Sequence, residues 1–441
     1  ILQKMDRVLQ TRGPVGLIQF IKPIRVQFLN YLSGSQEKTP GVRTTSDGIP
    51  ICLGDLIQKI RGSSSPEMIE KSILPFLSTI FWCTRSLKPN VPEDMSTITV
   101  PPRGNTAEEI TLGKYIRDFW KSMGYRKGKT VPRSLRFRSY HFTTKSGPNG
   151  HALGHYLDDL DAIPESLWDS ISKVGGELLA GRMKTLRKYS DLLRSNGHLP
   201  KPKGKLLIRK LVSFPDVEGK KRIVAELDYF RQASLKPLHH WLFRLLRRIP
   251  QDRTFNQGGF VNTFDDCDEE LYSVDLTAAT DRFPITFICR VLSGVLPDEY
   301  VTSWHNIMVG YPFDFRGRKV IYAAGNPMGA YSSWATFAVA HHYVVYYCCR
   351  ELGIDWKGYR YHLLGDDIVL SGNKVGELYM NVLTKLGVEY SKLKTHKSKT
   401  LFEFAKRYFY KGYSSRFWEI TPFPVSALKE VSRRSYLLTN L

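Results

Sequence analysis

Residues 361–371, Tyr-His-Leu-Leu-Gly-Asp-Asp-Ile-Val-Leu-Ser, constrain this chain more than any other stretch. Apolar residues lead up to Gly365, two carboxylates follow, and residues 368–370 form a second apolar run. Two short apolar runs around such a turn predict a β-hairpin whose tip carries Asp366 and Asp367. Adjacent carboxylates on a rigid turn suit Mg²⁺, which usually binds one or two carboxylates together with substrate phosphates. Gly-Asp-Asp is also an ordinary turn, so the rest of the chain must decide between these interpretations.

The charge balance points to a polyanionic partner. The 441 residues contain 64 Lys and Arg against 42 Asp and Glu, which gives a net charge of +22. Such an excess favours nucleic acid first and an anionic membrane surface second, although a generally basic soluble protein is a third interpretation. With 42% hydrophobic and 24% charged residues, the chain is expected to be globular and to divide into domains or subdomains.

Cysteine spacing and hydropathy bear on the compartment. The 6 cysteines contain no Cys-x-x-Cys pair, so we expect neither a zinc ribbon nor a disulfide framework. We therefore expect the protein in a reducing or organellar interior rather than outside the cell. The most apolar window, residues 334–349, is shorter than the roughly 20 residues of a membrane span, so no stable span is expected. The sequence begins at Ile1 rather than Met, so we interpret it as a fragment or trimmed product. It shows no signal-peptide pattern.

Three basic stretches precede the carboxylates. Residues 133–138 alternate basic and apolar residues and predict a strand with one cationic face. Residues 143–150 form a loop rich in hydroxyls and glycine, either a phosphate-binding loop or a plain surface loop. Residues 219–228 place three cations after a glycine turn, at the start of an apolar strand. The arginine there could bind a triphosphate through its fork, or the stretch could be a solvated basic turn.

Two further acids attract attention upstream of the hairpin. Asp275 lies within a predicted buried strand, residues 271–276, where a lone carboxylate is costly unless it is paired or binds metal. Asp281 follows near the start of a predicted helix, where an acid could also simply favour the helix dipole. If the strands of Asp275 and of the Gly-Asp-Asp hairpin are neighbours, their carboxylates could hold two Mg²⁺ ions for attack of a hydroxyl on an α-phosphorus.

The remaining segments predict helices and one more hairpin. Residues 233–249, 335–348 and 375–386 read as helices, and a Gly/Pro/Ser loop at 324–334 opens the second of them. His341 and His342 are adjacent, so they should point to different sides of that helix rather than chelate together. Residues 387–397 predict a lysine-rich strand or loop. Residues 402–412 alternate aromatic and basic residues, which indicates a hairpin on a nucleic-acid surface or a half-buried strand with cationic edges.

The order of these segments resembles the RNA-dependent RNA polymerases of positive-strand RNA viruses, in particular the mitovirus branch near narnaviruses, ourmia-like viruses and leviviruses. The resemblance runs from about residue 133 to 424 and rests on six motifs: Gly-Lys-Lys-Arg-Ile-Val-Ala at 219–225, Asp-Leu-Thr-Ala-Ala-Thr-Asp at 275–281, Gly-Asn-Pro-Met-Gly-Ala-Tyr-Ser-Ser-Trp-Ala at 325–335, Leu-Gly-Asp-Asp at 364–367, Lys-Thr-His at 394–396 and Phe-Glu-Phe at 402–404.

The resemblance implies an α+β, right-hand polymerase with fingers, a palm with an antiparallel sheet, and a small thumb. We expect a helical N-terminal segment at 1–105, fingers at 106–265, a palm at 266–412 and a short thumb or C-terminal segment at 413–441, with part of 283–324 belonging to the fingers. Only 29 residues follow position 412, so the thumb is small or completed by the N-terminal segment. The role of residues 1–100 and the mode of initiation stay open.

The resemblance also assigns roles to individual residues. Two Mg²⁺ ions, replaceable by Mn²⁺, would bind Asp275 and Asp366, with Asp367 as a supporting ligand. Lys394 would be the general acid for departing pyrophosphate, with Lys392 as an open alternative. The incoming NTP would meet Lys220, Lys221, Arg222, Asp281, Asn326 and Ser333. The RNA would meet Thr144, Lys145, Ser146, Gly147, Asn149, Gly325 and Gly329.

The implied activity is copying of a positive-strand RNA genome from NTPs, with a single-stranded RNA template and a nascent duplex as partners, in the matrix of host mitochondria. No protein partner is indicated. Many related polymerases carry an asparagine along the helix after the Gly/Pro/Ser loop, but Phe337 stands there, so ribose selection would rest on Asp281 and a serine. The alternatives are a reverse transcriptase, whose tip usually reads aromatic-x-Asp-Asp, and a non-catalytic RNA-binding relic.

Overall fold

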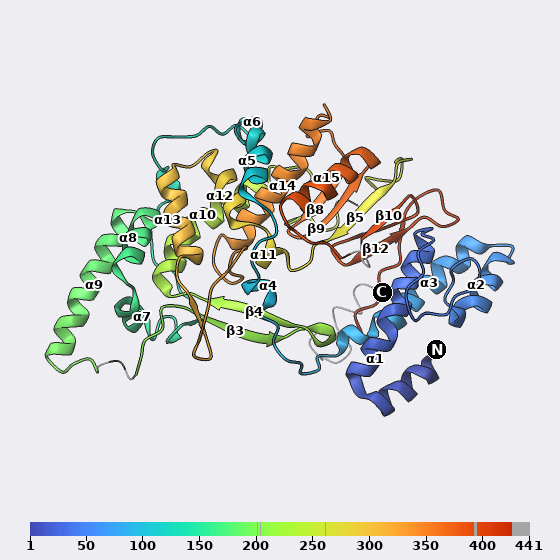
Figure 1. The fold of residues 1–441 in the computed structure, drawn as a ribbon, viewed down its shortest axis with the longest axis horizontal. Helices are drawn as coiled ribbons and strands as arrows, with labels where there is room; N and C mark the ends of the chain where they lie inside the picture. The colour runs from blue at the N-terminus through green and yellow to red at the C-terminus, as the bar shows by residue number, and fades with distance from the viewer. Residues whose placement is uncertain (201, 203, 261, 392–394, 426–441) are drawn as a thin grey trace.

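The computed structural model describes residues 1–441 except 201, 203, 261, 392–394 and 426–441. Helices and strands are mixed along the whole chain, so the predicted α+β class is confirmed (Figure 1). The α-helices are α1 (Leu2–Leu32), α2 (Gly54–Arg61), α3 (Pro66–Trp82), α4 (Ser96–Thr99), α5 (Thr106–Leu112), α6 (Ile116–Ser122), α7 (Tyr156–Ala162), α8 (Glu165–Gly175), α9 (Glu177–Ser195), α10 (Tyr229–Leu246), α11 (Ala279–Arg282), α12 (Ile285–Ser293), α13 (Asp298–Val309), α14 (Ser333–Glu351) and α15 (Asn373–Lys385).

Four small sheets are distributed among these helices. The strands are β1 (Ser146–Gly147), β2 (Gly150–His151), β3 (Lys210–Pro215), β4 (Lys221–Glu226), β5 (Leu271–Asp275), β6 (Phe313–Phe315), β7 (Arg318–Val320), β8 (Tyr361–Leu364), β9 (Asp367–Ser371), β10 (His396–Ser398), β11 (Leu401–Phe404), β12 (Arg407–Tyr410) and β13 (Trp418–Glu419). Short 3₁₀ turns include η2 (Cys83–Ser86), η4 (Arg133–Leu135) and η5 (Val217–Gly219).

The central sheet has the order β10-β5-β9-β8, and all its strand pairs are antiparallel. Helices α14 and α15 cover one face, where Val274 and Ile368 join the main hydrophobic core. The β11–β12 hairpin covers the other face, where Leu271 and Val369 pack against a cluster of phenylalanines (Figure 1). The predicted strand at 271–276 and the predicted Gly-Asp-Asp hairpin are therefore confirmed, as are the helices predicted at 233–249, 335–348 and 375–386.

A second sheet, ordered β4-β3-β6-β7, extends below the central sheet in Figure 1. Its longest pair is the β3–β4 hairpin, which is in register from Lys210 opposite Glu226 to Pro215 opposite Lys221. The turn at η5 lies beside α1 at the N-terminal end of the chain (Figure 1). The basic strand predicted from residues 219–228 is thus confirmed as β4.

Two sequence-based expectations change. The strand predicted at 133–138 is wrong, because residues 133–135 form a 3₁₀ turn after Pro132 and the following extended residues pair with no strand that the structure describes. The apolar positions of that stretch, Leu135 and Phe137, are instead buried in the main core. The hairpin predicted at 402–412 is confirmed, but Phe402 and Phe409 are fully buried, so the half-buried interpretation holds for its aromatic residues.

The N-terminal helices pack on the C-terminal sheet. Phe28 and Phe81, from α1 and α3, share a hydrophobic cluster with Leu401, Tyr408 and Ile420. The N-terminal helices therefore cover the β11–β12–β13 sheet, whose first two strands lie within the range predicted for the palm. That this segment completes a short thumb remains a prediction. The proposed domain limits themselves remain a prediction. No helix of the described ranges is long and apolar enough to cross a membrane.

Candidate active site

The register of the central sheet brings the three predicted metal ligands together. Asp275, the last residue of β5, lies directly opposite Asp367, the first residue of β9. Asp366 precedes it in the β8–β9 turn and is exposed, while Gly365 adopts the left-handed φ of 61° that this tight turn requires. Cross-strand neighbours place their Cβ atoms about 4.5–5.5 Å apart. Three carboxylates therefore gather at one end of two paired strands.

The carboxylates of Asp275 and Asp367 share the sheet face that meets the β11–β12 hairpin. Side chains alternate along a strand, and Leu271 and Val369, two or four residues away, pack into the phenylalanine cluster on that face. Lys406, in the turn of the covering hairpin, donates to Asp367 with Nζ–Oδ1 and Nζ–Oδ2 distances of 3.1 and 3.5 Å. Burial raises the pKa of Asp367, while Lys406 opposes that rise and the neighbouring acids add to it.

A fourth carboxylate, Glu403, reinforces this negative centre. Its backbone N–H donates to the Ser273 hydroxyl at 2.9 Å, which fixes β11 against β5. The pKa of Glu403 is raised to about 7. Burial is the main cause, Lys406 opposes it, and the charges of Asp367 and Asp275 add to it. Acids crowded in this way are stabilised by a cation. Hard carboxylate oxygens are the donors that Mg²⁺ prefers, so the residues present fit this ion.

The described residues do not hold a closed cage for a metal. No group of three or more His, Cys, Asp or Glu side chains among them converges closely enough to enclose an ion. An open arrangement is compatible with Mg²⁺, which usually binds one or two carboxylates and completes its coordination with water and substrate phosphates. Lys392 and Lys394, the candidate general acids, lie outside the described residues.

A buried histidine fixes the turn that carries Asp366. His341, on α14, donates from Nδ1 to the Gly365 carbonyl at 2.7 Å, and its Nε2 accepts from the Tyr379 hydroxyl at 2.6 Å. Burial lowers the pKa of His341 to about 3, so the ring is neutral. His342 points to another side of the helix, toward Asp252 and Tyr361. The expectation that the two histidines do not chelate together is confirmed.

Asp281, Asn326 and Ser333 form a polar cluster, because the N–H of Gly325 donates to the Asp281 carbonyl at 2.9 Å and the N–H of Asn326 donates to the Thr280 carbonyl at 3.0 Å. Asp281 accepts a hydrogen bond from the Thr97 hydroxyl through Oδ2, at 2.8 Å, and burial raises its pKa. The Ser333 hydroxyl donates to Oδ1 of Asn326. The other oxygen of Asp281 and the Nδ2 of Asn326 are buried and bond to no described protein atom. A buried acceptor and a buried donor side by side suit a sugar hydroxyl, which both donates and accepts.

The Gly/Pro/Ser loop between these parts is tightly packed against its own chain. A Cβ on Gly325 would lie 2.2 Å from the Thr280 carbonyl oxygen, and one on Gly329 would lie 2.5 Å from the Ala225 carbonyl oxygen. The N–H of Ala225 also donates to the Met328 carbonyl at 2.7 Å. Because the two glycines lack side chains, the loop can pack closely against α11 at Gly325 and against β4 at Gly329. Their predicted contact with RNA remains a prediction.

The three cations of the basic hairpin differ in their surroundings. Arg222 is exposed and its Nε donates to Asp216 on the same hairpin at 2.6 Å. It shares a face of β4 with Lys220 and with Val224, which packs against Gly329. Lys221 points to the opposite face, where it forms a largely buried ion pair with Glu93 at 2.8 Å. The structure therefore groups Lys220 and Arg222 on the loop side of the hairpin and sets Lys221 apart.

The predicted template loop forms the β1–β2 hairpin. Thr144, Lys145 and Ser146 are exposed, as RNA contacts require. Asn149 is instead occupied with protein: its Nδ2 donates to Asp159 at 2.8 Å and to the Leu207 carbonyl at 3.0 Å, and its Oδ1 accepts from the Leu207 N–H. Gly147 packs against Asp159 as well. These two residues support the loop. The other three of its five predicted RNA contacts are exposed.

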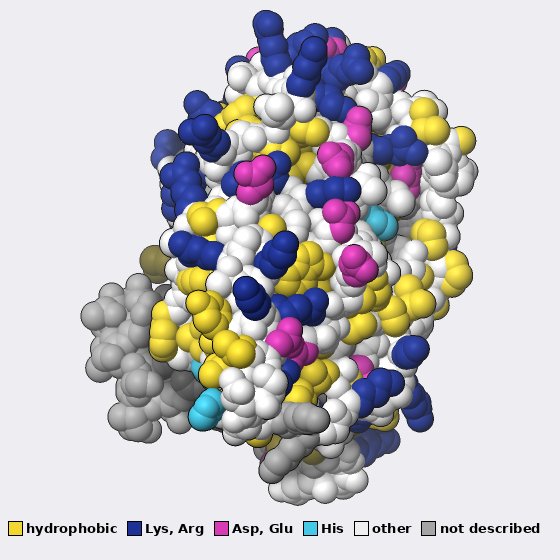
Figure 2. All heavy atoms as spheres, turned by 90° about the vertical axis from the view of Figure 1, so that its left-hand side faces the viewer, with side chains coloured by type: hydrophobic (Ala, Val, Ile, Leu, Met, Phe, Trp, Pro, Cys, Tyr) yellow, Lys and Arg dark blue, Asp and Glu magenta, His cyan; other side chains and the backbone are white. Residues whose placement is uncertain are grey.

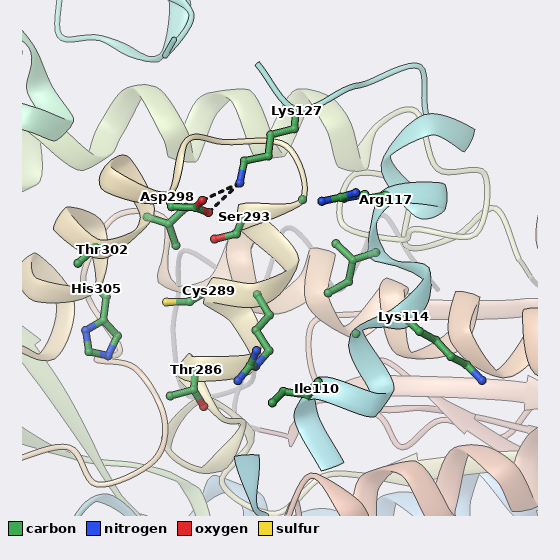
Figure 3. A pocket seen from close by; sticks show the side chains of 15 residues that line it. Ile110, Lys114, Arg117, Lys127, Thr286, Cys289, Ser293, Asp298, Thr302 and His305 are labelled. Atoms are coloured by element: carbon green, nitrogen blue, oxygen red, sulfur yellow. Dashed lines mark hydrogen bonds and ion pairs between the residues drawn. The ribbon is translucent and has the colours of Figure 1, made fainter. Parts of the chain in front are cut away.

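A cavity of about 720 Å³ lies away from this centre, between α5, α6, α12 and α13 (Figure 3). Lys127 crosses its mouth to pair with Asp298 at 2.8 Å. Burial raises the pKa of Cys289 on its wall to about 12, so that thiol stays protonated. None of the predicted site residues lines this cavity. The face on the left of Figure 1, drawn in Figure 2, carries many Lys and Arg side chains among scattered acids, in keeping with the net charge.

A comparison with known families decides the relationship of the chain. Residues 134–441, well over half of it, match the mitovirus RNA-dependent RNA polymerase family. The chain belongs to this family. The α+β polymerase fold inferred from the motifs is therefore confirmed, together with the mitovirus relationship.

The chain is similar to several individual proteins. The chain is 29% identical over 436 residues to an RNA-directed RNA polymerase of Cryphonectria parasitica mitovirus 1, covering 92% of this chain but 52% of that protein. The chain thus spans about half the length of this mitovirus relative. An uncharacterized mitochondrial protein of Arabidopsis thaliana is 34% identical over 155 residues, 33% of this chain and 74% of that protein. The RNA-dependent RNA polymerase of a human picorbirnavirus superposes with a TM-score of 0.47 at 14% identity, covering 92% and 77% of the two chains.

Several residues of the site were not identified from the sequence. Lys406 lies within a stretch recognised only as aromatic and basic, and Thr97 lies in a segment without a recognised motif. Glu403 belongs to the Phe-Glu-Phe motif, but no role was assigned to it from the sequence. Asn326 belongs to the loop motif, yet its pairing with Ser333 is a consequence of folding. Phe337, which the sequence comparison set against the asparagine of related polymerases, is buried against the rings of Phe283 and His341.

The contact of His341 with the turn predicts a stability effect. Replacing His341 by Leu leaves the Gly365 carbonyl and the Tyr379 hydroxyl buried without a partner, and each costs about 1–3 kcal/mol. We expect the free energy of unfolding to fall by roughly 2–6 kcal/mol, against about 1–3 kcal/mol for Tyr379→Phe, which leaves only the Nε2 of His341 without a partner. Urea denaturation followed by circular dichroism measures both. Equal losses for the two variants would contradict the role of His341 at the turn.

The buried Asp159 predicts a pH-dependent stability. Burial, followed by the charge of Asp228, raises the pKa of Asp159 to about 7 in the folded chain. Between about pH 4 and 7 the folded state then holds a proton that the unfolded state releases, so this group destabilises the fold as the pH rises. Asp159→Asn should raise the melting temperature at pH 8 relative to the parent, and less at pH 5. The exposed Asp191→Asn is the control, and a pH-independent difference would contradict the assignment.

Proposed function

We propose that this chain is an RNA-dependent RNA polymerase that copies a positive-strand RNA genome by nucleotidyl transfer from NTPs and releases pyrophosphate. The observation that carries the proposal is the in-register opposition of Asp275 and Asp367, with Asp366 in the adjoining turn, in a chain of the mitovirus polymerase family. One alternative, a reverse transcriptase, would share the paired carboxylates but usually carries an aromatic-x-Asp-Asp tip, whereas this tip reads Gly-Asp-Asp.

The carboxylates would hold two Mg²⁺ ions, or Mn²⁺ in their place, principally through Asp275 and Asp366 with Asp367 in support. Bound there, the ions would stabilise charge on the attacking 3′-oxygen and on the leaving pyrophosphate. The side chains of this chain then have separate tasks. Lys406 balances the charge of Asp367 on the side of the β11–β12 hairpin, and His341 keeps the turn in one conformation so that Asp366 is presented at a fixed position.

Substrate recognition would come from the groups around this centre. Lys220 and Arg222, on the loop side of β4, would bind the triphosphate, while Lys221 would hold the hairpin to Glu93 rather than contact nucleotide. Asp281 and Asn326 would receive the ribose 2′-hydroxyl through their unpartnered buried atoms. A lysine, Lys394 or Lys392, would protonate pyrophosphate. Thr144, Lys145 and Ser146 would follow the template, supported by Gly147 and Asn149.

The RNA partners and the location follow from the same relationship. A single-stranded template and the growing duplex are polyanions, which a chain of net charge +22 attracts. We infer that the protein acts in the matrix of host mitochondria. The support is that relatives include a polymerase of a mitovirus and a mitochondrial plant protein.

Activity and its dependence on Asp366 test this proposal directly. The purified chain, incubated with a single-stranded RNA template, labelled NTPs and Mg²⁺, should yield product of template length. Asp366→Asn keeps the size of the side chain but removes its charge, and we expect it to lower the rate at least about 100-fold, because metal-bound carboxylates supply several kcal/mol of transition-state stabilisation. Tight RNA binding without extension by the parent, in Mg²⁺ or Mn²⁺, would instead support the non-catalytic relic.

The polar cluster of Asp281 and Asn326 predicts a preference for NTP over dNTP. Asp281→Ala and Asn326→Ala each remove one partner of the ribose hydroxyl, so the ratio of kcat/KM for NTP over dNTP should fall about tenfold in each variant. The exposed Asn196→Ala is the control and should keep the parent ratio. The ratio is measured on one RNA template with both substrates. A parent that prefers dNTP would favour the reverse transcriptase. An unchanged ratio in both variants would show that this polar cluster takes no part in ribose selection.

A further inference from the structure

The turn of the basic hairpin is held by the N-terminal segment, to which no role has been assigned. The match to the polymerase family begins at residue 134. Glu218, in the turn between β3 and β4, has a left-handed φ of 55° and its N–H donates to the Leu87 carbonyl at 2.9 Å. Its carboxylate accepts from both terminal nitrogens of Arg25, at 2.6 and 3.0 Å, and from the Thr84 hydroxyl at 2.7 Å. Four contacts thus join one turn residue to the first 100 residues.

The Arg25–Glu218 pair has the properties of a specific anchor. The two side chains are only 9% and 10% exposed, and the bidentate geometry satisfies both carboxylate oxygens. Burial opposes ionisation of Glu218, yet Arg25 and Thr84 lower its pKa to about 2, so the pair is charged at every physiological pH. A shielded, bidentate pair of this kind is weakened little by salt, unlike the exposed ion pairs elsewhere on the chain.

A second anchor lies at the start of β4. Glu93 accepts from Lys221 at 2.8 Å and from the Ser213 hydroxyl at 3.0 Å, so one carboxylate from the N-terminal segment contacts both strands of the hairpin. Arg316 also pairs with Glu93, at 3.0 Å. The hairpin is thereby fixed from the side opposite to Arg222.

The same segment also reaches the hairpin that covers the carboxylates. The Arg25 guanidinium lies over the Trp82 ring, 5.2 Å from its centroid, and the Trp82 ring packs edge-on against Tyr408 of β12 with centroids 4.8 Å apart. Tyr408 is two residues from Lys406, which pairs with Asp367. A continuous series of contacts therefore connects the turn of the β3–β4 hairpin to the metal-ligand side of the molecule.

We propose that residues 1–100 position the β3–β4 hairpin over the active site and so set the affinity for the incoming nucleotide, with the Arg25–Glu218 pair as the decisive contact. The inference rests on the polymerase function proposed above. β3 pairs with β6 only at Lys210, so the part of the hairpin that carries the turn is two-stranded. A two-stranded hairpin is only marginally stable by itself, so a free turn would have to be ordered each time Lys220 and Arg222 bind a triphosphate. The anchor removes that ordering cost before the nucleotide arrives. Arg25 is a positioning residue, because it acts through Glu218.

Steady-state kinetics on the full chain test the proposal. In Arg25→Met the KM for NTP should rise about tenfold, while kcat at saturating NTP and the Kd for template stay within about twofold of the parent. Glu218→Gln should behave alike, and the double variant should be no worse than the more affected single variant, since both remove one interaction. Arg61→Met is the matched control: it breaks the exposed Arg61–Asp47 pair of the same segment, at 2.5 Å, and should leave KM unchanged.

Hydrogen exchange supplies a readout that needs no activity. In Arg25→Met the amides of residues 216–222 should exchange faster, while those of β5 and β9 keep the parent rates. An unchanged KM with unchanged exchange would overturn the inference. Faster exchange over the whole chain, with kcat and KM both affected, would also overturn it, since Arg25 would then serve folding in general. If the parent chain incorporates no nucleotide, the polymerase proposal fails on its own, and exchange at 216–222 still decides whether the segment anchors the hairpin.

Discussion

The pairing of β5 with β9 is the constraint on which the rest of the site depends. In the observed register Asp275 faces Asp367, and both side chains point away from the helices. A shift by one residue would turn Asp275 into the core beneath α15 and bring Val274 to the face that the β11–β12 hairpin covers, because side chains alternate along a strand. The alternation of Leu271 and Val369 with Tyr272 and Ile368 makes that shift costly, since each set is buried against its own layer. The hydrophobic pattern of two short strands thus fixes the position of charged groups.

Collecting carboxylates in a strongly basic chain creates a local field of opposite sign. Asp275, Asp366, Asp367 and Glu403 lie near one another, and Lys406 is a cation that the structure places against them. The raised pKa values of Asp367 and Glu403 reflect the burial of these acids first and their crowding second. Stability alone would favour fewer acids here. Under the proposed function, a centre that keeps them would gain an affinity for divalent cations, and the basic surroundings would attract the polyanion on which such a cation would act.

Local patterns predicted the elements that carry the chemistry. Asp275 was identified because a lone acid interrupts an apolar strand, and the Gly-Asp-Asp turn because two apolar runs flank it. The same alternation failed at residues 133–138, where the apolar side chains are buried without strand pairing, so pattern alone did not reveal the missing partner. The pairs Arg25–Glu218, Thr97–Asp281 and Lys406–Asp367 join residues that are 193, 184 and 39 positions apart. One sequence contains no signal for such contacts, since nothing in the local pattern around one residue identifies its distant partner.

The distribution of the cores also couples the two ends of the chain. The apolar faces of α1 and α3 are covered in part by Leu401, Tyr408 and Ile420, so these helices cannot bury their faces fully until the last strands exist. Arg25 and Trp82 belong to those same helices, and they are the groups that reach Glu218 in the β3–β4 turn. The helices that anchor the basic hairpin and the sheet that covers the carboxylates therefore share one hydrophobic cluster. Because that sheet also brings Lys406 to Asp367, the packing of the N-terminal helices contacts both the basic hairpin and the hairpin over the carboxylates.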